Sequence, residues 1–99
     1  MVWTPQAQED LLDIYVAIGL DNTAAAERMY TVFEERVSML AQSPRMGMRR
    51  KEIAPSTRML VEGMYLILYE THPDTDEGPV EAVEIVRIVH GHRDLNRIV

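Results

Sequence analysis

The spacing of apolar residues changes once along this chain, and that change constrains the fold more than any other feature. From residue 5 to residue 43, apolar side chains recur every three or four residues, which is the period of a helix with one buried side. From residue 58 to residue 90, short runs rich in valine, isoleucine, leucine and tyrosine are separated by turn residues, which is typical of strands. The pattern predicts an α+β fold.

Two helices are expected in the first half. Thr4-Pro5 predicts the start of the first, because threonine caps free N–H groups and proline at the first helical position loses no hydrogen bond. Gly19 is expected to end this helix in a left-handed conformation. A longer helix starts at Asp21-Asn22-Thr23 and should end near Ser43, because Pro44 disfavours helical geometry in the preceding residue. So short a link predicts an antiparallel helical hairpin.

The strands are expected at both ends of the chain. Residues 1–3 are short and apolar, and residues 58–62 and 64–71 flank a compact turn at Glu62-Gly63. His72 and the residues up to 79 form a polar loop, so His72 is expected to be solvated. Residues 80–90 are interpreted as a central strand buried on both faces. The expected architecture is an N-terminal strand, then an antiparallel helical hairpin packed on a small antiparallel β-sheet, in the order β-α-α-β-β-β.

Length and composition restrict the class of protein. A chain of 99 residues fits a single domain, 1–99. It has no cysteine, which excludes disulfides and thiolate chemistry and fits a reducing compartment. Its apolar runs are shorter than the roughly 20 residues that a membrane span needs, and its first residues do not resemble a secretory signal. We therefore expect a cytoplasmic protein that does not bind membranes.

The charge is acidic overall but unevenly placed. A net charge of −6 disfavours binding to phosphate backbones, so no direct nucleic-acid binding is expected. Residues 45–62 carry five bases against two acids, residues 63–86 carry six acids and no base, and residues 87–99 carry three bases against one acid. The two basic segments either converge on one face or are scattered charge that favours solubility.

Several short motifs follow one another in order along the chain. They are Trp3-Thr4 with Ala7, Asp10, Leu11 and Ile14; Asn22 with Ala25-Ala26-Glu27-Arg28; Leu40, Ser43-Pro44, Gly47 and Arg49-Arg50; Arg58 and Gly63-Met64-Tyr65-Leu66-Ile67 with Tyr69; and Val86-Arg87-Ile88-Val89-His90-Gly91-His92-Arg93-Asp94-Leu95. With these motifs the chain resembles the ParE branch of the RelE/ParE toxin superfamily over nearly its whole length. The closing segment is the most specific of them.

The resemblance implies both a fold and a function. The implied fold is a helical hairpin on an antiparallel sheet. The implied function is that of a noncatalytic toxin in a type II toxin–antitoxin system, of the kind that stabilises a plasmid or chromosome. Such a toxin inhibits DNA gyrase, and so DNA replication, until a ParD-like antitoxin neutralises it by direct binding in a hetero-oligomer. No cofactor is implied.

The RelE branch, which cuts messenger RNA on the ribosome, is the main alternative. Cleavage requires charged groups that transfer protons and stabilise the phosphorane. By resemblance, basic residues would stand at the positions of Arg58, Leu60, Leu66 and Arg93, with a tyrosine near the C-terminus; two of these positions are leucine, and the chain closes on Val99 without that tyrosine. A degenerate, non-toxic module that still binds the antitoxin is a third alternative.

Histidines could replace the missing basic groups in a nuclease. His90 and His92 flank Gly91 at the end of a predicted strand, where both rings could serve as acid or base or bind a metal. Two ligands without nearby acids are a weak metal signal, so no metal site is predicted. The favoured interpretation is that His90 packs at the strand end and His92 is exposed.

Candidates for partner binding come from the basic segments and the closing motif. Arg49, Arg50 and Lys51 form either a contact patch or a solvated turn. Arg58 and Arg87 are expected to offer planar forks to carboxylates, of a partner or of Glu62, Glu70 or Glu84. Charge reversal at Arg49 and Arg50 should therefore weaken antitoxin binding or gyrase inhibition. The candidate set is Arg49, Arg50, Lys51, Arg58, Arg87, His90, His92 and Arg93, with no catalytic residue. Trp3 is expected in the core, and Met46 and Met48 either pack or act as adaptable contacts.

Overall fold

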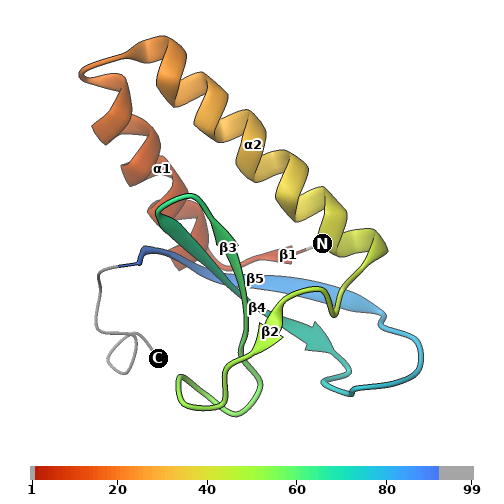
Figure 1. The fold of residues 1–99 in the computed structure, drawn as a ribbon. Coiled ribbons are helices and arrows are strands. Elements are labelled where there is room, and N and C mark those ends of the chain that lie inside the picture. The colour runs from red at the N-terminus through yellow and green to blue at the C-terminus, as the bar shows by residue number, and fades with distance from the viewer. Residues whose placement is uncertain (1, 92–99) are drawn as a thin grey trace.

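A computed structural model describes residues 2–91, and these residues have the α+β fold that the sequence predicts (Figure 1). Two helices pack against a five-stranded sheet. In chain order the elements are β1 (Val2–Trp3), α1 (Pro5–Gly19), α2 (Thr23–Gln42), β2 (Met48–Arg49), β3 (Arg58–Glu62), β4 (Tyr65–His72) and β5 (Ala82–His90). Neither helix has the length and apolar composition that crossing a bilayer requires.

The predicted helix starts are confirmed by their caps. The Thr4 hydroxyl accepts a hydrogen bond from the Ala7 N–H at 3.0 Å, and the Asn22 side chain accepts one from Ala25 at the same distance. Helix α1 ends at Gly19 as predicted, but the left-handed conformation predicted for Gly19 was wrong, since its φ is not positive and the cap residue Leu20 has right-handed helical geometry. The N–H groups of Leu20 and Asn22 donate back to carbonyls of the last turn, so the link needs no left-handed residue.

The sheet is mixed rather than wholly antiparallel. Its strand order is β1-β5-β4-β3-β2, and β1 pairs with β5 in parallel, with Val2 opposite Glu84 and Trp3 opposite Ile85. Thr4 extends this contact, because its N–H donates to Ile85 O and its hydroxyl to Val86 O. The other three strand pairings are antiparallel. The short edge strand β2 was not predicted, since two residues show no periodicity.

The strand that is buried on both faces is β4, not β5. β4 lies in the middle of the sheet and buries five of its eight residues, whereas β5 meets β1 over two positions only. β5 begins at Ala82, so Val80 and Glu81 lie before it. His72 is the last residue of β4 rather than part of the following loop.

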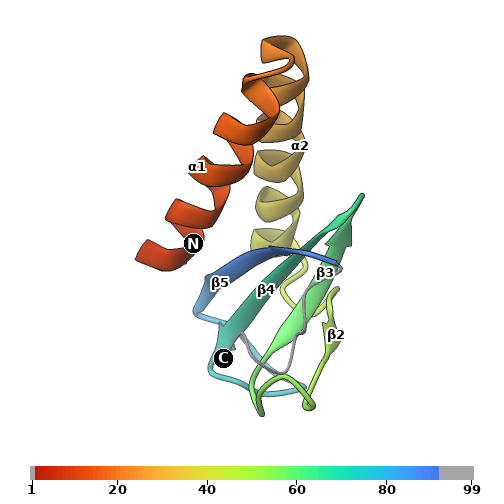
Figure 2. The same cartoon turned by 90° about the vertical axis from the view of Figure 1, so that its left-hand side faces the viewer.

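The helices cover one face of the sheet (Figure 2). The main core lies between the helices and the sheet and includes Phe33, Leu40, Ile67, Tyr69 and Ile85. A smaller cluster on the opposite face joins Ile53, from the connection between β2 and β3, to Leu66, Leu68 and Val89. The fold therefore leaves the outer sides of the hairpin and part of the second sheet face open to solvent.

Candidate interaction surfaces

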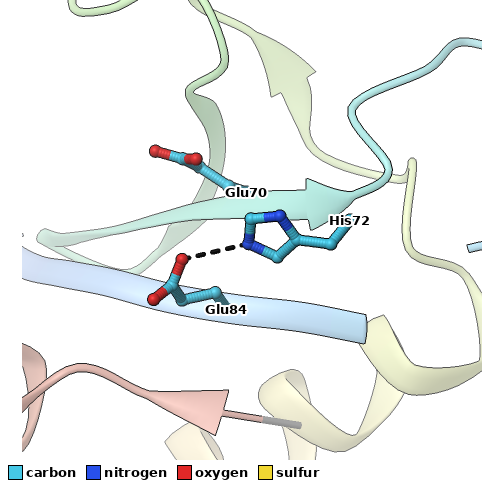
Figure 3. Close-up of side chains that lie close together, drawn as sticks. All are labelled: Glu70, His72 and Glu84. Atoms are coloured by element: carbon cyan, nitrogen blue, oxygen red, sulfur yellow. Dashed lines mark hydrogen bonds and ion pairs between the residues drawn. The ribbon is translucent and has the colours of Figure 1, made fainter. Parts of the chain in front are cut away.

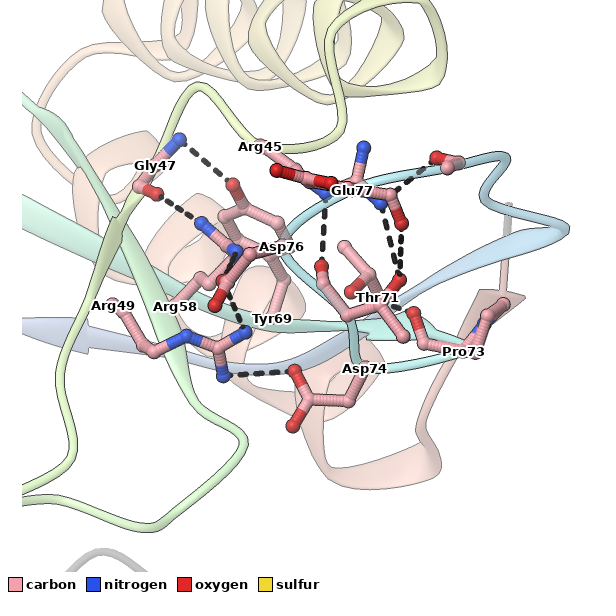
Figure 4. Close-up of polar contacts among 12 residues, drawn as sticks. Arg45, Gly47, Arg49, Arg58, Tyr69, Thr71, Pro73, Asp74, Asp76 and Glu77 are labelled. Atoms are coloured by element: carbon pink, nitrogen blue, oxygen red, sulfur yellow. Dashed lines mark hydrogen bonds and ion pairs between the residues drawn. The ribbon is translucent and has the colours of Figure 1, made fainter.

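Three arginines bind the loop that joins β4 to β5 (Figure 4). Arg45 donates to the carbonyls of Thr75 and Gly78, both at 2.9 Å. Arg49 pairs with Asp74 and Asp76, each at 2.9 Å. Arg58 pairs with Asp76 at 3.2 Å. Arg49 and Arg58 of the basic segment therefore form ion pairs with Asp74 and Asp76 of the acidic segment that follows it.

Arg58 is the buried member of this network. Its side chain is 7% exposed and donates to the Gly47 carbonyl at 3.2 Å. The neighbouring Tyr69 hydroxyl accepts a hydrogen bond from the Gly47 N–H at 2.8 Å, and burial raises the pKa of this phenol. The contacts fix the chain between α2 and β2 against the sheet, so Arg58 has a structural role whatever else it binds.

Replacing Gly47 with alanine is expected to lower the free energy of unfolding by about 2 kcal/mol through overpacking. An added Cβ would lie 2.5 Å from the Tyr69 hydroxyl and 2.9 Å from the Met59 carbonyl. Gly19→Ala is the control, because its Cβ would meet only Ala26 at 3.6 Å and alanine favours helix, so it should stabilise by about 0.5 kcal/mol. Denaturant unfolding measures both; a Gly47 variant as stable as the parent would contradict this packing.

The other two basic candidates near this network, Arg50 and Lys51, differ in whether they form an ion pair. Arg50 pairs with Glu52, which lies two residues further on. Lys51 is exposed and forms no ion pair with another described residue. The Arg49 guanidinium holds the pKa of Asp76 below its usual value, mainly by hydrogen bonding. Partner binding by Arg49, Arg50, Lys51 and Arg58 stays a prediction, and Lys51 is the residue whose substitution disturbs this network least.

Arg87 is held by a carboxylate of α1. It donates to both oxygens of Asp10, at 2.8 and 3.1 Å, and the Ile88 N–H donates to the same carboxylate at 3.0 Å. Burial favours the neutral acid, but the hydrogen bonds from Arg87, Ile88 and Gln6 outweigh it and lower the pKa of Asp10. Asp10 thus occupies the edge of β5 beyond the short β1. Arg87 offers its planar fork to a carboxylate as predicted, but that carboxylate is Asp10 and not Glu62, Glu70 or Glu84.

The closing motif is only partly described. His90 packs edge-on against Tyr65 with ring centres 5.7 Å apart, and Tyr65 contacts Phe33 of the core in the same manner. This packing agrees with the favoured interpretation of His90. His92 and Arg93 lie outside the described residues, so the predictions for them stay untested.

A groove runs between the two helices, with a volume of about 850 Å³. Its apolar lining includes Trp3, Leu11, Leu12, Tyr15 and Tyr30. Leu12 is 59% exposed and Tyr30 is 40% exposed, although both are large apolar side chains. Tyr15 and Tyr30 pack edge to face across the groove, with ring centres 6.1 Å apart. Exposed apolar grooves of this kind are where amphipathic segments of partners bind.

The polar side of the groove is acidic. Glu27 and Glu34, one heptad apart on α2, both line it, and both are exposed. Neither forms an ion pair with another described residue. The sequence assigned its candidates from charge and did not single out this groove, although the exposed apolar Leu12 beside the buried stripe was the available signal.

A comparison with protein-family models identifies the chain. The model described as the ParE toxin of the type II toxin–antitoxin system parDE matches residues 1–95. The chain belongs to this ParE toxin family. The resemblance seen in the motifs is thereby confirmed.

A solved structure has the same fold. It is described as the chromosomal ParDE TA system from P. aeruginosa, with a TM-score of 0.70 and 23% sequence identity. The match covers 89% of this chain and 90% of that chain. At this identity the similarity supports the fold alone. Among curated proteins, none matches the chain.

This ParE family member has core leucines at two positions where the RelE resemblance would place basic residues. Leu60 is 7% exposed and packs in the main core, and Leu66 is 8% exposed and packs in the smaller cluster. A charged side chain could not replace either without an unpaired buried charge. Positions 58 and 60 both lie on β3, and only Arg58 is basic there. Its guanidinium is bound to Asp76 and to the Gly47 carbonyl.

Proposed function

We propose that this ParE family protein acts in the cytoplasm as a noncatalytic toxin that inhibits DNA gyrase and is neutralised by a ParD-like antitoxin. The match of the ParE toxin family over residues 1–95 carries the proposal. The buried leucines at positions 60 and 66 support the noncatalytic part, because leucine can neither transfer a proton nor pair with a phosphate.

The antitoxin is proposed to occupy the groove between α1 and α2. An amphipathic segment would place apolar side chains against Leu12 and Tyr30, and basic side chains on its flank would meet Glu27 and Glu34. No residue of the arginine network lines the groove, so the surface that meets gyrase is proposed to include Lys51 and its neighbours. Charge reversal at Arg49 would also place an acid against Asp74 and Asp76, so Lys51→Glu is the cleaner test.

Purified protein is expected to abolish the supercoiling activity of gyrase in vitro, and a stoichiometric amount of antitoxin should restore it. On induction in a bacterial host, cells should form filaments and mount a DNA damage response while translation continues at first. The antitoxin-bound protein is the matched control in both experiments.

Two other outcomes would replace this proposal. Cleavage of ribosome-bound transcripts, lost on substitution of Arg93 or His90, would establish a RelE-like ribonuclease. Antitoxin binding with neither gyrase inhibition nor cleavage would establish a non-toxic module.

A further inference from the structure

Three side chains of types that can bind a metal lie close together on the sheet face that the helices leave open (Figure 3). Glu70 and His72 lie two residues apart on β4, and Glu84 lies on the neighbouring β5. Their neighbours Tyr69 and Val83 are buried in the main core, so alternation along the strands directs the three away from the helices. One ligand atom from each lies within 4.8 Å of the other two, and His72 Nε2 is 3.0 Å from Glu84 Oε1.

The carboxylates of Glu70 and Glu84 lie opposite each other on neighbouring strands, where their like charges repel. Glu70 and Glu84 are direct cross-strand partners, and like charges in such positions destabilise a sheet. The flanking pairs Tyr69–Ile85 and Thr71–Val83 fix the register, so the two acids cannot move apart along the strands. Glu70 forms no hydrogen bond or ion pair with another residue of the described part, 2–91. The strands therefore hold negative charge together where a cation would relieve it.

We propose that Glu70, His72 and Glu84 bind a divalent transition-metal ion of the Zn²⁺ class. Zn²⁺ takes imidazole nitrogen and carboxylate oxygen at about 2.0–2.2 Å, which puts tetrahedral ligand atoms roughly 3.3 Å apart. The present separation of His72 from Glu84 is already close to that value, and Glu70 has only to rotate inward. The imidazole ligand favours Zn²⁺ over Ca²⁺ and Mg²⁺, which prefer oxygen ligands.

The position of the ion gives it a structural consequence. His72 ends β4 and Glu84 lies near the start of β5, on either side of the loop that carries Asp74 and Asp76. An ion bound here would clamp the base of that loop. Three protein ligands leave at least one position for water, which predicts moderate affinity and ready removal by a chelator.

Zinc titration of tag-free, chelator-treated protein at pH 8 tests the proposal by calorimetry and by thermal unfolding. The expected result is one ion bound per chain and a rise in Tm of roughly 5 °C or more at 100-fold excess over Kd. His72→Gln, Glu84→Gln and Glu70→Gln should each weaken binding at least about tenfold. Without metal, Glu70→Gln should instead raise Tm, because it removes the like-charge opposition.

Two variants serve as matched controls. Glu77→Gln removes the same charge from the exposed loop, and His90→Gln removes the other described histidine; both should keep the affinity of the parent. The proposal is overturned if no ion binds, if His72→Gln leaves zinc binding intact, or if His90→Gln abolishes it. Equal stabilisation by Ca²⁺ that survives His72→Gln would also overturn it, because it would indicate an acidic surface alone.

Discussion

Replacing Asp10 with alanine is expected to lower the free energy of unfolding by about 3 kcal/mol, which corresponds to a fall in Tm of roughly 10–20 °C. Asp10 is 8% exposed, and the loss of its carboxylate leaves the Arg87 guanidinium and the Ile88 N–H without their partner. A buried donor left unpaired costs about 1–3 kcal/mol by itself. The Arg87 side chain is 18% exposed, so water can hydrate it in part once Asp10 is removed. The loss in free energy of unfolding is therefore expected at the lower end of the range for broken buried ion pairs.

Asp13→Ala is the matched control for this substitution. Asp13 lies on the same helix, is exposed, and has no partner among the described residues, so its loss should change stability by less than about 0.5 kcal/mol. Equal effects of the two alanine variants in denaturant unfolding would mean that the Asp10–Arg87 contact contributes nothing measurable. A double-mutant cycle with Arg87→Ala isolates the pairwise part.

The same carboxylate predicts a pH dependence with a definite sign. The pKa of Asp10 is lowered in the folded protein, so its ionised form contributes stability that is present above the unfolded-state value of 3.8. That contribution is lost as pH falls below 3.8 and through the folded-state pKa. Asp10→Asn should therefore be less stable than the parent at pH 7, and the difference should shrink as the pH falls through this range. A difference that stays constant from pH 7 to acid would contradict the linkage.

Features that depend on neighbouring residues could be predicted from the sequence. Thr4 and Asn22 cap the helices because their oxygens meet N–H groups three residues away. A compact turn containing Gly63 joins β3 to β4, but it is Gly63-Met64, one residue later than the predicted Glu62-Gly63, and Gly63 allows it with a φ of 59°. These contacts lie within one turn of helix or one hairpin, so residue type and spacing determine them.

Features that depend on distant residues could not be predicted. The parallel pairing of β1 joins Trp3 to Ile85, and nothing in three apolar residues specifies a partner so far along the chain. Asp10 illustrates the same limit. An acid near the start of a helix is ordinarily attributed to the helix dipole, but its spacing of three and four residues from Ala7 and Ile14 places it on the buried stripe. Only the fold reveals that Arg87 meets it there.

The candidate sites also divide into those that the sequence indicated and those that only the fold brings together. Charge alone indicated Arg49 and Arg58 as partner contacts, but the acidic loop that binds them follows β4, two strands further along the chain than Arg49 and one strand further than Arg58. The groove and the Glu70–His72–Glu84 cluster required the helix packing and the strand register, because each combines residues from two or more elements. Exposed apolar surface at Leu12 is what distinguishes the groove from an ordinary helix face.

Replacing Leu12 with lysine is expected to weaken antitoxin binding by about 30-fold or more while gyrase inhibition is retained. Leu12 lies in the groove proposed for the antitoxin, and a lysine there would be desolvated against apolar side chains and repel the basic flank expected of the partner. The protein should then remain toxic in cells that also produce the antitoxin. Binding is measured with purified components, and gyrase inhibition is measured separately, so loss of toxicity cannot be mistaken for loss of neutralisation.

Leu20→Lys is the matched control for the groove. It adds the same charge to an exposed leucine of the same hairpin, at 82% exposure and outside the groove lining, so it should leave the antitoxin Kd within about threefold of the parent. A Leu12 variant that binds as tightly as the Leu20 variant would place the antitoxin elsewhere. Because both substitutions add the same charge at an exposed leucine and only Leu12 lines the groove, the ratio of their Kd values tests whether the antitoxin binds there.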